Sequence, residues 1–245
     1  MIPKSHPRAV SLLIREKLVS GFDSGLVAKE GLIAHGRGET FDYLLGEKTT
    51  KNAKKAIKAA SQALILAKSP VISVNGNIAA LCAKEIVQLA KISNAKIEVN
   101  LFYSTTQRRQ SIAKLFGKNG AKKIFGLEPK KSRRISGLDS PRRVVDKDGI
   151  YAADVVLVPL EDGDRTLALK KTGKKVITFD LNPLSRTAQT ADITIVDNVV
   201  RGLKELIKEC KKSKNPEKIQ FDNKKNLSEA ISEIRKNLAR RARRA

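Results

Sequence analysis

The chain is poor in several residue types that define common site chemistries: it has no tryptophan, one methionine, two cysteines and two histidines, and aromatic residues make up 4% of it. Cys82 and Cys210 lie far apart in predicted amphipathic helices, without C-x-x-C spacing or nearby metal ligands. We interpret both as small buried side chains. No apolar run approaches the roughly 20 residues that span a bilayer, and the chain does not open on a signal-peptide core. These absences predict a cytoplasmic protein without membrane association.

Positive charge is in large excess, because 49 Lys and Arg residues face 25 Asp and Glu residues, a net charge of +24. One alternative is therefore a basic nucleic-acid-binding α/β protein. The excess is concentrated in residues 118–143 and 200–245, however, and the shortage of aromatic residues leaves few side chains on which bases could stack. We expect no specific nucleic-acid partner. The same positive field would attract small phosphorylated substrates.

The middle of the chain alternates between short β-branched runs and amphipathic helical segments. Continuous apolar strands separated by helices are typical of a parallel sheet that is covered on both faces. We predict a Rossmann-like three-layer α/β fold with a mostly parallel sheet, a helical N-terminal region and a C-terminal helix. The predicted strands cover residues 71–74, 97–99, 155–158, 176–179 and 193–196. A single domain is expected, with an N-terminal region (1–69), a nucleotide-binding core (70–210) and a basic tail (211–245).

Polar clusters follow each of these predicted strands. If the strands are parallel, the clusters meet at one edge of the sheet, where open α/β sheets bind their ligands. The alternative is that Asn, Asp and Gly only form turns there, which explains five such clusters less well than one. The clusters are Asn75-Gly76-Asn77, Asn100, Glu161-Asp162, Asp180-Leu181-Asn182 and Asp197-Asn198.

The segment 31–46 contains His35, Arg37 and two carboxylates among glycines, and we interpret it as a loop that can wrap an anion. Neither common phosphate motif is present. Gly36-x-Gly38 lacks the third glycine of a dinucleotide fingerprint, which disfavours a dinucleotide-dependent oxidoreductase, and residues 46–50 lack P-loop spacing. A bound nucleotide would therefore depend on individual arginines and strand-end loops.

Helices are predicted before and after this core. The first covers residues 6–20, with Ser5 as N-cap and Gly21 at its end, and the second covers 50–68. In the first helix the spacing of Arg15 favours a solvated face. The last helix is predicted from Asn226, with Glu229 completing a capping box. Its apolar stripe must be covered by the chain itself or by a second subunit, and consists of Leu227, Ile231, Ile234 and Leu238.

Residues 126–150 are rich in charged residues and glycine, and we predict a long excursion over the surface. Within it, Arg142 and Arg143 have two open interpretations. They could contact a substrate phosphate, or they could be mobile.

Three motifs together resemble a known family. Ser5-His6-Pro7-Arg8-Ala9, residues 30–39 and residues 180–188 are similar to the archaeal phosphopantothenate synthetases, the 4-phosphopantoate:β-alanine ligases, up to about Cys210. The resemblance implies a Rossmann-type homodimer that condenses 4-phosphopantoate with β-alanine to 4′-phosphopantothenate in coenzyme A synthesis. It implies ATP as co-substrate, an acyl adenylate, release of AMP and pyrophosphate, and Mg²⁺ to neutralise the leaving group.

The resemblance also implies roles for particular residues. His35 and Glu39 are the candidates for orienting the substrate or removing a proton from β-alanine. No metal ligand is assigned. The implied nucleotide contacts are Arg15, Arg37, Asp180, Leu181, Asn182, Arg186, Thr187, Asp197 and Asn198.

Overall fold

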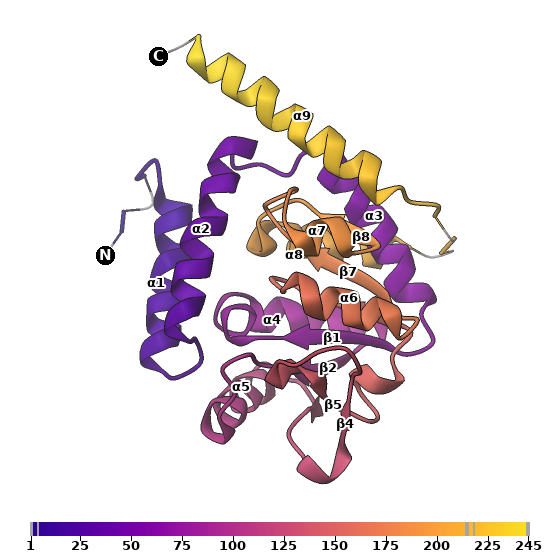
Figure 1. Cartoon of the computed structure of the whole chain (residues 1–245). Helices are drawn as coiled ribbons and strands as arrows, with labels where there is room; N and C mark the ends of the chain where they lie inside the picture. The colour runs from indigo at the N-terminus through magenta and orange to yellow at the C-terminus, as the bar shows by residue number, and fades with distance from the viewer. Residues whose placement is uncertain (1, 4, 214–215, 218, 244–245) are drawn as a thin grey trace.

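The computed structural model describes every residue except 1, 4, 214–215, 218 and 244–245. Within the described residues, a six-stranded parallel sheet in the order β3-β2-β1-β6-β7-β8 forms the centre of the molecule (Figure 1). The predicted α/β fold with a parallel sheet is confirmed, and all five predicted strands are present within about a residue. The strands are β1 (Pro70–Val74), β2 (Lys96–Val99), β3 (Ile124–Phe125), β6 (Val155–Leu157), β7 (Lys175–Phe179) and β8 (Ile193–Ile195).

Four helices cover one face of the sheet. Ile72 and Val74 of β1 point to this face because side chains alternate along a strand, whereas Val71 points to the other. Phe116 and Ile86 are fully buried in this layer. The helices are α3 (Lys51–Leu66), α4 (Gly76–Ser93), α5 (Thr106–Lys118) and α8 (Val199–Lys212).

The other face is covered by two shorter helices, α6 (Gly163–Lys171) and α7 (Arg186–Thr190), and by residues 126–153, which we call the arm. The prediction of a surface excursion is wrong for the arm, because its widely spaced apolar side chains, Ile135 and Val145 among them, pack with Val71 and Val156 of the sheet. The arm contains η1 (Pro129–Lys131), β4 (Ser132–Arg134), η2 (Pro141–Arg143), β5 (Val144–Asp146) and η3 (Ile150–Ala152), with β4 and β5 antiparallel.

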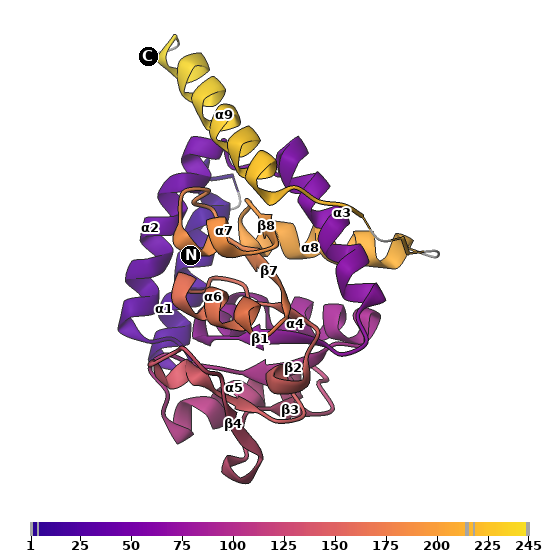
Figure 2. The same ribbon diagram turned by 45° about the vertical axis from the view of Figure 1, so that its right-hand side comes forward.

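Two N-terminal helices, α1 (Ala9–Asp23) and α2 (Lys29–Leu45), lie side by side next to the sheet layers (Figures 1 and 2). The predicted boundaries of α1 are wrong: the helix begins four residues after Ser5, has no side-chain N-cap, and continues through Gly21. A Cβ on Gly21 would lie 2.7 Å from the Cβ of Ala80 in α4. Gly21 therefore serves close helix packing and does not end the helix.

The predicted anion-wrapping loop at residues 31–46 is also wrong, because this segment forms α2 and its C-cap. Only Gly46 adopts the left-handed conformation, with φ 88°. The buried residues of α2 are Glu39, Asp42 and Leu45, so polar contacts hold most of its inner face. A helix of this kind has no apolar stripe, which is why hydrophobic periodicity did not indicate it.

The last helix, α9 (Asn223–Ala242), begins three residues before the predicted start, and Asp222 is its N-cap in place of the predicted capping box at Asn226. Its C-terminal part projects from the body of the molecule (Figures 1 and 2). Leu227 is buried, whereas Leu238 is 46% exposed, so the chain itself covers only part of the predicted stripe. Asn237 is buried and donates a hydrogen bond of 2.8 Å to the carbonyl oxygen of Leu44, near the end of α2.

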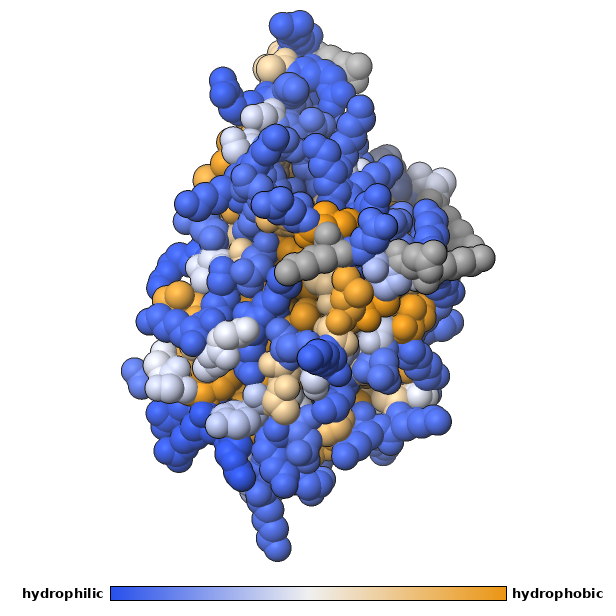
Figure 3. Space-filling view, turned by 90° about the vertical axis from the view of Figure 1, so that its right-hand side faces the viewer, coloured by the Kyte–Doolittle hydropathy of each residue, from blue (hydrophilic) through white to orange (hydrophobic). Residues whose placement is uncertain are grey.

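Both cysteines are buried as predicted, Cys82 in α4 and Cys210 in α8, and burial raises the pKa of each thiol to about 12. Hydrophilic residues cover most of the face shown in Figure 3, with apolar side chains between them. Within the described part of the chain, no helix is long and apolar enough to cross a bilayer.

The junction between the N-terminal helices and the sheet gives a test of the fold. A Cβ on Gly76 would overlap the carbonyl oxygen of Leu26, a backbone atom that cannot rotate away. We expect Gly76→Ala to lower the free energy of unfolding by about 1–3 kcal/mol, as for other overpacked sites. The control is Gly117→Ala in α5, where nothing lies within 4 Å. Denaturant unfolding should show Gly117→Ala to be neutral or stabilising, and equal stabilities for both variants would contradict the packing described.

Candidate active site

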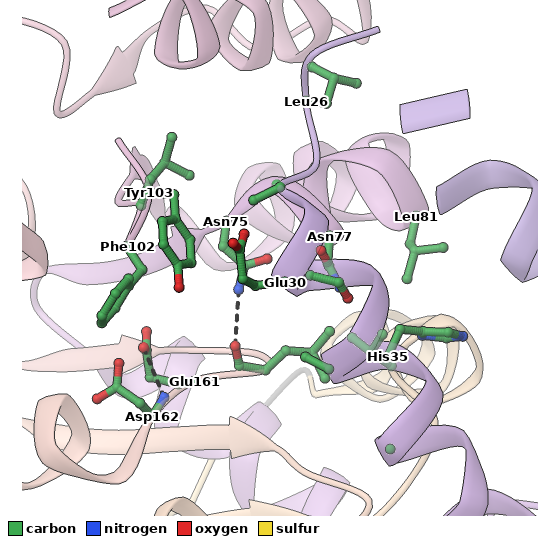
Figure 4. Close-up of a pocket in the computed structure, with 18 of the residues that line it drawn as sticks. Leu26, Glu30, His35, Asn75, Asn77, Leu81, Phe102, Tyr103, Glu161 and Asp162 are labelled. Carbon is green, nitrogen blue, oxygen red and sulfur yellow. Dashed lines mark hydrogen bonds between the residues drawn. The ribbon is translucent and has the colours of Figure 1, made fainter. Parts of the chain in front are cut away.

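The carboxyl ends of the parallel strands open into a cavity of about 380 Å³, which lies against α2 (Figure 4). Residues of four of the five predicted strand-end clusters line it: Asn75-Gly76-Asn77, Glu161-Asp162, Leu181 and Asn198. The cavity reaches across the point between β1 and β6 where the strand order reverses, which is where open α/β sheets bind ligands. The predicted ligand edge is therefore the site of this cavity.

The N-terminal half of α2 forms one wall of the cavity. Asn77 donates a hydrogen bond of 2.8 Å to the carbonyl oxygen of Gly31, and a Cβ on Gly31 would overlap the Asn77 side chain. This contact fixes α2 against the turn after β1. As a result, Glu30, Ala34 and His35 line the cavity. Figure 4 shows Glu30 opposite Phe102 and Tyr103 of the β2–α5 loop, with the ring of His35 turned to the side away from them.

Three helices begin at the cavity. Asn75 caps α4, Asp162 caps α6 and Asn198 caps α8, each by accepting a backbone N–H of its own helix at 2.8–3.0 Å. The N-termini of helices carry a partial positive charge and unsatisfied N–H groups. Their convergence makes the cavity suitable for a polyanionic ligand.

A buried ion cluster forms the floor of the cavity between β1 and β6. Glu161 pairs with Arg142 of the arm and with Arg165 of α6, while the Nη1 atom of Arg142 also lies 3.2 Å from Asp162. Arg165 is fully buried and donates to the Oγ atom of Ser73 at 3.2 Å. Burial lowers the pKa of both guanidinium groups to about 10, so both remain charged at neutral pH.

His35 lines the cavity. Its Nε2 atom is buried and has no hydrogen-bond partner among the described residues. Burial lowers the pKa of His35, against the opposing effect of the Glu39 carboxylate one turn further along α2. The lowered pKa favours the neutral form of the imidazole.

The other N-terminal candidates lie behind this wall. Glu39 accepts hydrogen bonds from Arg15 at 2.8 Å and from Tyr43 at 3.2 Å, and does not line the cavity. Arg15 lies on a partly solvated face, as its spacing predicted, with 42% of its side chain exposed, and it also binds Glu39. Arg37 is exposed on α2. Its positive charge opposes the effect of burial, which raises the pKa of Asp180.

The remaining candidates surround the ends of β7 and β8. Leu181 and Asn198 line the cavity, whereas Asp197 lies just behind it, binding Thr49 at 2.7 Å and Arg201 at 2.6 Å. Burial raises the pKa of Asp197.

In the β7–α7 loop, Asp180 accepts hydrogen bonds from Ser185 and from the backbone N–H of Asn182. Thr187 donates to the carbonyl oxygen of Glu161 at 2.9 Å. Arg186 is exposed and pairs with Asp164. The structure thus gathers the predicted β7 and β8 residues at one end of the cavity, but only some of them face it.

Several lining residues were not predicted as site residues. Glu30, Phe102, Tyr103 and Arg108 lie outside any cluster that follows a strand directly, although Phe102 and Tyr103 are only three and four residues beyond β2. Arg142 was left with two interpretations, and the structure places it in the cavity wall, nine-tenths buried. Among the described residues, no group of three or more His, Cys, Asp or Glu side chains could hold a metal ion by itself.

The arm is anchored to the end of β2 by two buried side chains. Glu98 accepts backbone N–H groups of Asp146 at 3.0 Å and Ile150 at 2.6 Å. Asn100 donates to the carbonyl oxygens of Arg142 and Val144 at 3.2 and 3.0 Å. Burial raises the pKa of Glu98 to about 7, although both backbone contacts and Arg165 oppose this.

The strand order, the cavity at the switch point and the three helix N-termini define a Rossmann-like α/β protein whose cavity, at the carboxyl edge of its sheet, suits an anionic ligand. A model of the family described as phosphopantothenate/pantothenate synthetase matches residues 52–237. The chain belongs to this family.

Curated relatives of the chain come from archaea. It is 53% identical to the 4-phosphopantoate–β-alanine ligase of Thermococcus kodakarensis, over 98% of this chain and 95% of that protein. It is 52% identical to the proteins of that name from Thermococcus onnurineus, over 98% and 95%, and Methanosarcina mazei, over 97% and 95%. The resemblance stated from the sequence is thereby confirmed.

The buried carboxyl of Glu98 gives a pH test of the site. Between pH 4.5, its ordinary pKa, and 7, the folded protein keeps a proton that the unfolded chain has released. The free energy of unfolding should therefore fall as pH rises through this window, by about 3 kcal/mol, since one pKa unit corresponds to roughly 1.4 kcal/mol. Glu98→Gln should lack this component in urea titrations, while exposed Glu16→Gln should keep it. Parallel curves for the wild type and Glu98→Gln would refute the assignment.

Proposed function

We propose that this protein is an ATP-dependent ligase that joins 4-phosphopantoate to β-alanine, forming 4′-phosphopantothenate for coenzyme A biosynthesis. The relatives named for this reaction support the proposal, since they are 52–53% identical over nearly the whole chain. The observation that carries it is the cavity where three helix N-termini meet buried arginines, because the two substrates ATP and 4-phosphopantoate are both polyanions. No feature of the cavity favours nucleic-acid binding or dinucleotide oxidoreduction.

The proposed chemistry follows from the low reactivity of a carboxylate as an acyl donor. A carboxylate oxygen of 4-phosphopantoate attacks the α-phosphorus of ATP, and pyrophosphate leaves. The amine of β-alanine then attacks the acyl carbon, AMP leaves, and one proton is released from the nitrogen. Charge develops on phosphate oxygens in the first step, where fixed donors and helix N-termini stabilise it most.

We place the nucleotide at the β7 and β8 end of the cavity. Leu181 and Asn198 would contact it directly, with Asp180, Asn182 and Thr187 shaping the loop beside it. Four further implied nucleotide contacts are charged residues that do not line the cavity, and their positions assign them different roles. Arg37 and Arg186 are exposed at this end and would turn toward phosphates, Arg186 by leaving Asp164, whereas Asp197 fixes the start of α8 and Arg15 holds Glu39.

We assign the proton transfer to His35, which lines the cavity and whose buried Nε2 atom has no hydrogen-bond partner among the described residues. Glu39 acts through His35, because its carboxylate raises the pKa of the imidazole against the effect of burial. Glu39 is therefore a positioning residue in this proposal, held in place by Arg15 and Tyr43.

Mg²⁺ fits the donor set of the cavity, because this ion is usually bound by one or two carboxylates together with substrate phosphates. Glu30 and Asp162 are the carboxylates that would hold it, since Glu161 is buried between two arginines, whereas the Asp162 side chain is 39% exposed beside one. The ion would supply charge neutralisation for the pyrophosphate leaving group.

We also propose that the protein is a cytoplasmic homodimer, as the family resemblance implies. The exposed end of the α9 stripe supports the dimer, because Leu238 is apolar and uncovered in a single chain. The cytoplasm is where ATP and phosphorylated intermediates of coenzyme synthesis are available to it.

The products of ATP distinguish the proposed mechanism from the alternative of an acyl phosphate. Purified protein with ATP, Mg²⁺, 4-phosphopantoate and β-alanine should release one AMP and one pyrophosphate for each phosphopantothenate formed. With the acid alone, it should exchange labelled pyrophosphate into ATP. Stoichiometric ADP and orthophosphate would exclude the adenylate.

Arg37 provides a test of the nucleotide end of the cavity. Arg37→Lys keeps the charge but loses the planar fork that matches a phosphate. We expect kcat/KM for ATP to fall about tenfold or more, since a hydrogen bond to a charged group contributes roughly 1.5–3 kcal/mol. Steady-state kinetics of the equally exposed Arg235→Lys on α9 should match the wild type. Unchanged kinetics of Arg37→Lys would show that Arg37 does not bind the nucleotide.

A further inference from the structure

We propose that Arg142 of the arm binds the phosphoryl group of the acid substrate and thereby determines selectivity for a phosphorylated acid. This inference rests on the proposed ligase function. It concerns a residue outside the set of nucleotide contacts, on an arm that covers the opposite face of the sheet from α4 and α8.

The guanidinium of Arg142 has an unused edge. Its Nη1 atom makes both ion pairs, with Glu161 and Asp162. Its Nε atom is buried and has no partner within the described structure, although Arg142 is nine-tenths buried and lines the cavity. An N–H left unpaired in this way is costly unless a ligand satisfies it. The Nε–H group and one Nη–H group of an arginine lie on the same edge of the guanidinium, and together they can donate to two oxygens of one phosphate.

The backbone around Arg142 is fixed before any ligand arrives. Asn100, at the end of β2, donates to the carbonyl oxygens of Arg142 and Val144. Glu98, two residues earlier, holds the next residues of the arm through Asp146 and Ile150. Because the backbone of Arg142 and its Nη1 atom are both held, the side chain loses little conformational entropy when a ligand binds, which favours affinity and selectivity.

The arm side of the cavity suits the phosphate of the acid better than that of ATP. The arm is anchored at the end of β2, three strands from β7, where the nucleotide is placed, and from there the guanidinium of Arg142 reaches Glu161 and Asp162 after β6, one strand from β7. The carboxylate of 4-phosphopantoate must meet ATP, so its phosphate, at the other end of the molecule, points away from β7. Arg108 stands on this side as well, donating to Tyr103 at 2.7 Å.

The walls between these two ends match the rest of the acid. Its middle carbon carries two methyl groups, and the cavity offers apolar side chains from four different segments, Leu26, Leu81, Leu101 and Leu160. Apolar walls with a few fixed polar groups are the usual design of a small-molecule site. An acid without the phosphate would keep these wall contacts and lose only those with Arg142 and Arg108.

The test compares two substrates that differ by one phosphate. For the wild type, Arg142→Lys and Arg143→Lys, kcat/KM is measured with 4-phosphopantoate and with pantoate at saturating ATP and β-alanine. We expect Arg142→Lys to reduce the preference for 4-phosphopantoate at least tenfold, while the KM values for ATP and β-alanine stay within about twofold. Arg143→Lys is the matched control, because Arg143 is the adjacent arm residue and does not line the cavity.

Other outcomes overturn the inference. A loss of ATP affinity would assign Arg142 to the nucleotide, an increase in the KM for β-alanine would assign it to the amine substrate, and equal losses with both acids would leave it a structural role. Thermal melting verifies folding, and Arg142→Gln replaces the lysine variant if that protein is unfolded. Calorimetric titration of 4-phosphopantoate and pantoate into the same proteins measures selectivity without turnover. A wild type that binds 4-phosphopantoate through Arg142 but forms no product would refute the ligase proposal alone.

Discussion

Glu161 connects three elements on one face of the sheet, namely the arm, α6 and α7. Its carboxylate pairs with Arg142 of the arm and Arg165 of α6, and its carbonyl oxygen accepts a hydrogen bond from Thr187 of α7. Two guanidinium groups in a cavity floor are tolerable only if their charges are balanced, because an unpaired buried charge costs several kcal/mol. The arm, α6 and the cavity floor therefore depend on one carboxylate, and α7 is held by the backbone of the same residue.

A second set of ion pairs holds the N-terminal wall of the cavity, which is formed by α2, against the sheet. Arg201 of α8 binds Asp42 of α2 at 2.7 Å and Asp197 after β8 at 2.6 Å, while Asn198 also contacts Asp42 at 3.0 Å. These contacts attach a helix with almost no apolar face to the end of the sheet. Charge thus takes the place of a hydrophobic stripe in positioning α2, and with it His35.

The sequence was a good guide wherever burial was apolar and periodic. The strands, α3 and α4 follow from β-branched runs and from apolar residues three and four positions apart, and parallel strands bring the polar clusters to one edge. His35, Leu181 and Asn198 were identified in this way or by resemblance, and all line the cavity.

The errors on α2 and on the arm come from contacts between residues far apart in the sequence. α2 is held by the ion pair of Asp42 with Arg201, 159 positions away, and glycines in its sequence indicated a loop. The apolar residues of the arm are too widely spaced to form a pattern, yet the fold brings Ile135, Val145 and Ile150 together. The roles of Arg142 and Arg165 depend on partners that only the tertiary structure supplies. Long-range pairing of charges leaves no periodic signal in one sequence.

The contact between Asn237 and Leu44 joins the two ends of the chain. The last carbonyl groups of a helix have no partner within it, and Asn237 donates its hydrogen bond to one of them across 193 positions of sequence. Every residue that lines the cavity lies between Leu26 and Val199, so during synthesis on a ribosome the whole lining is made before α9. The wall that carries His35 therefore gains this support at its far end only after the lining residues are complete.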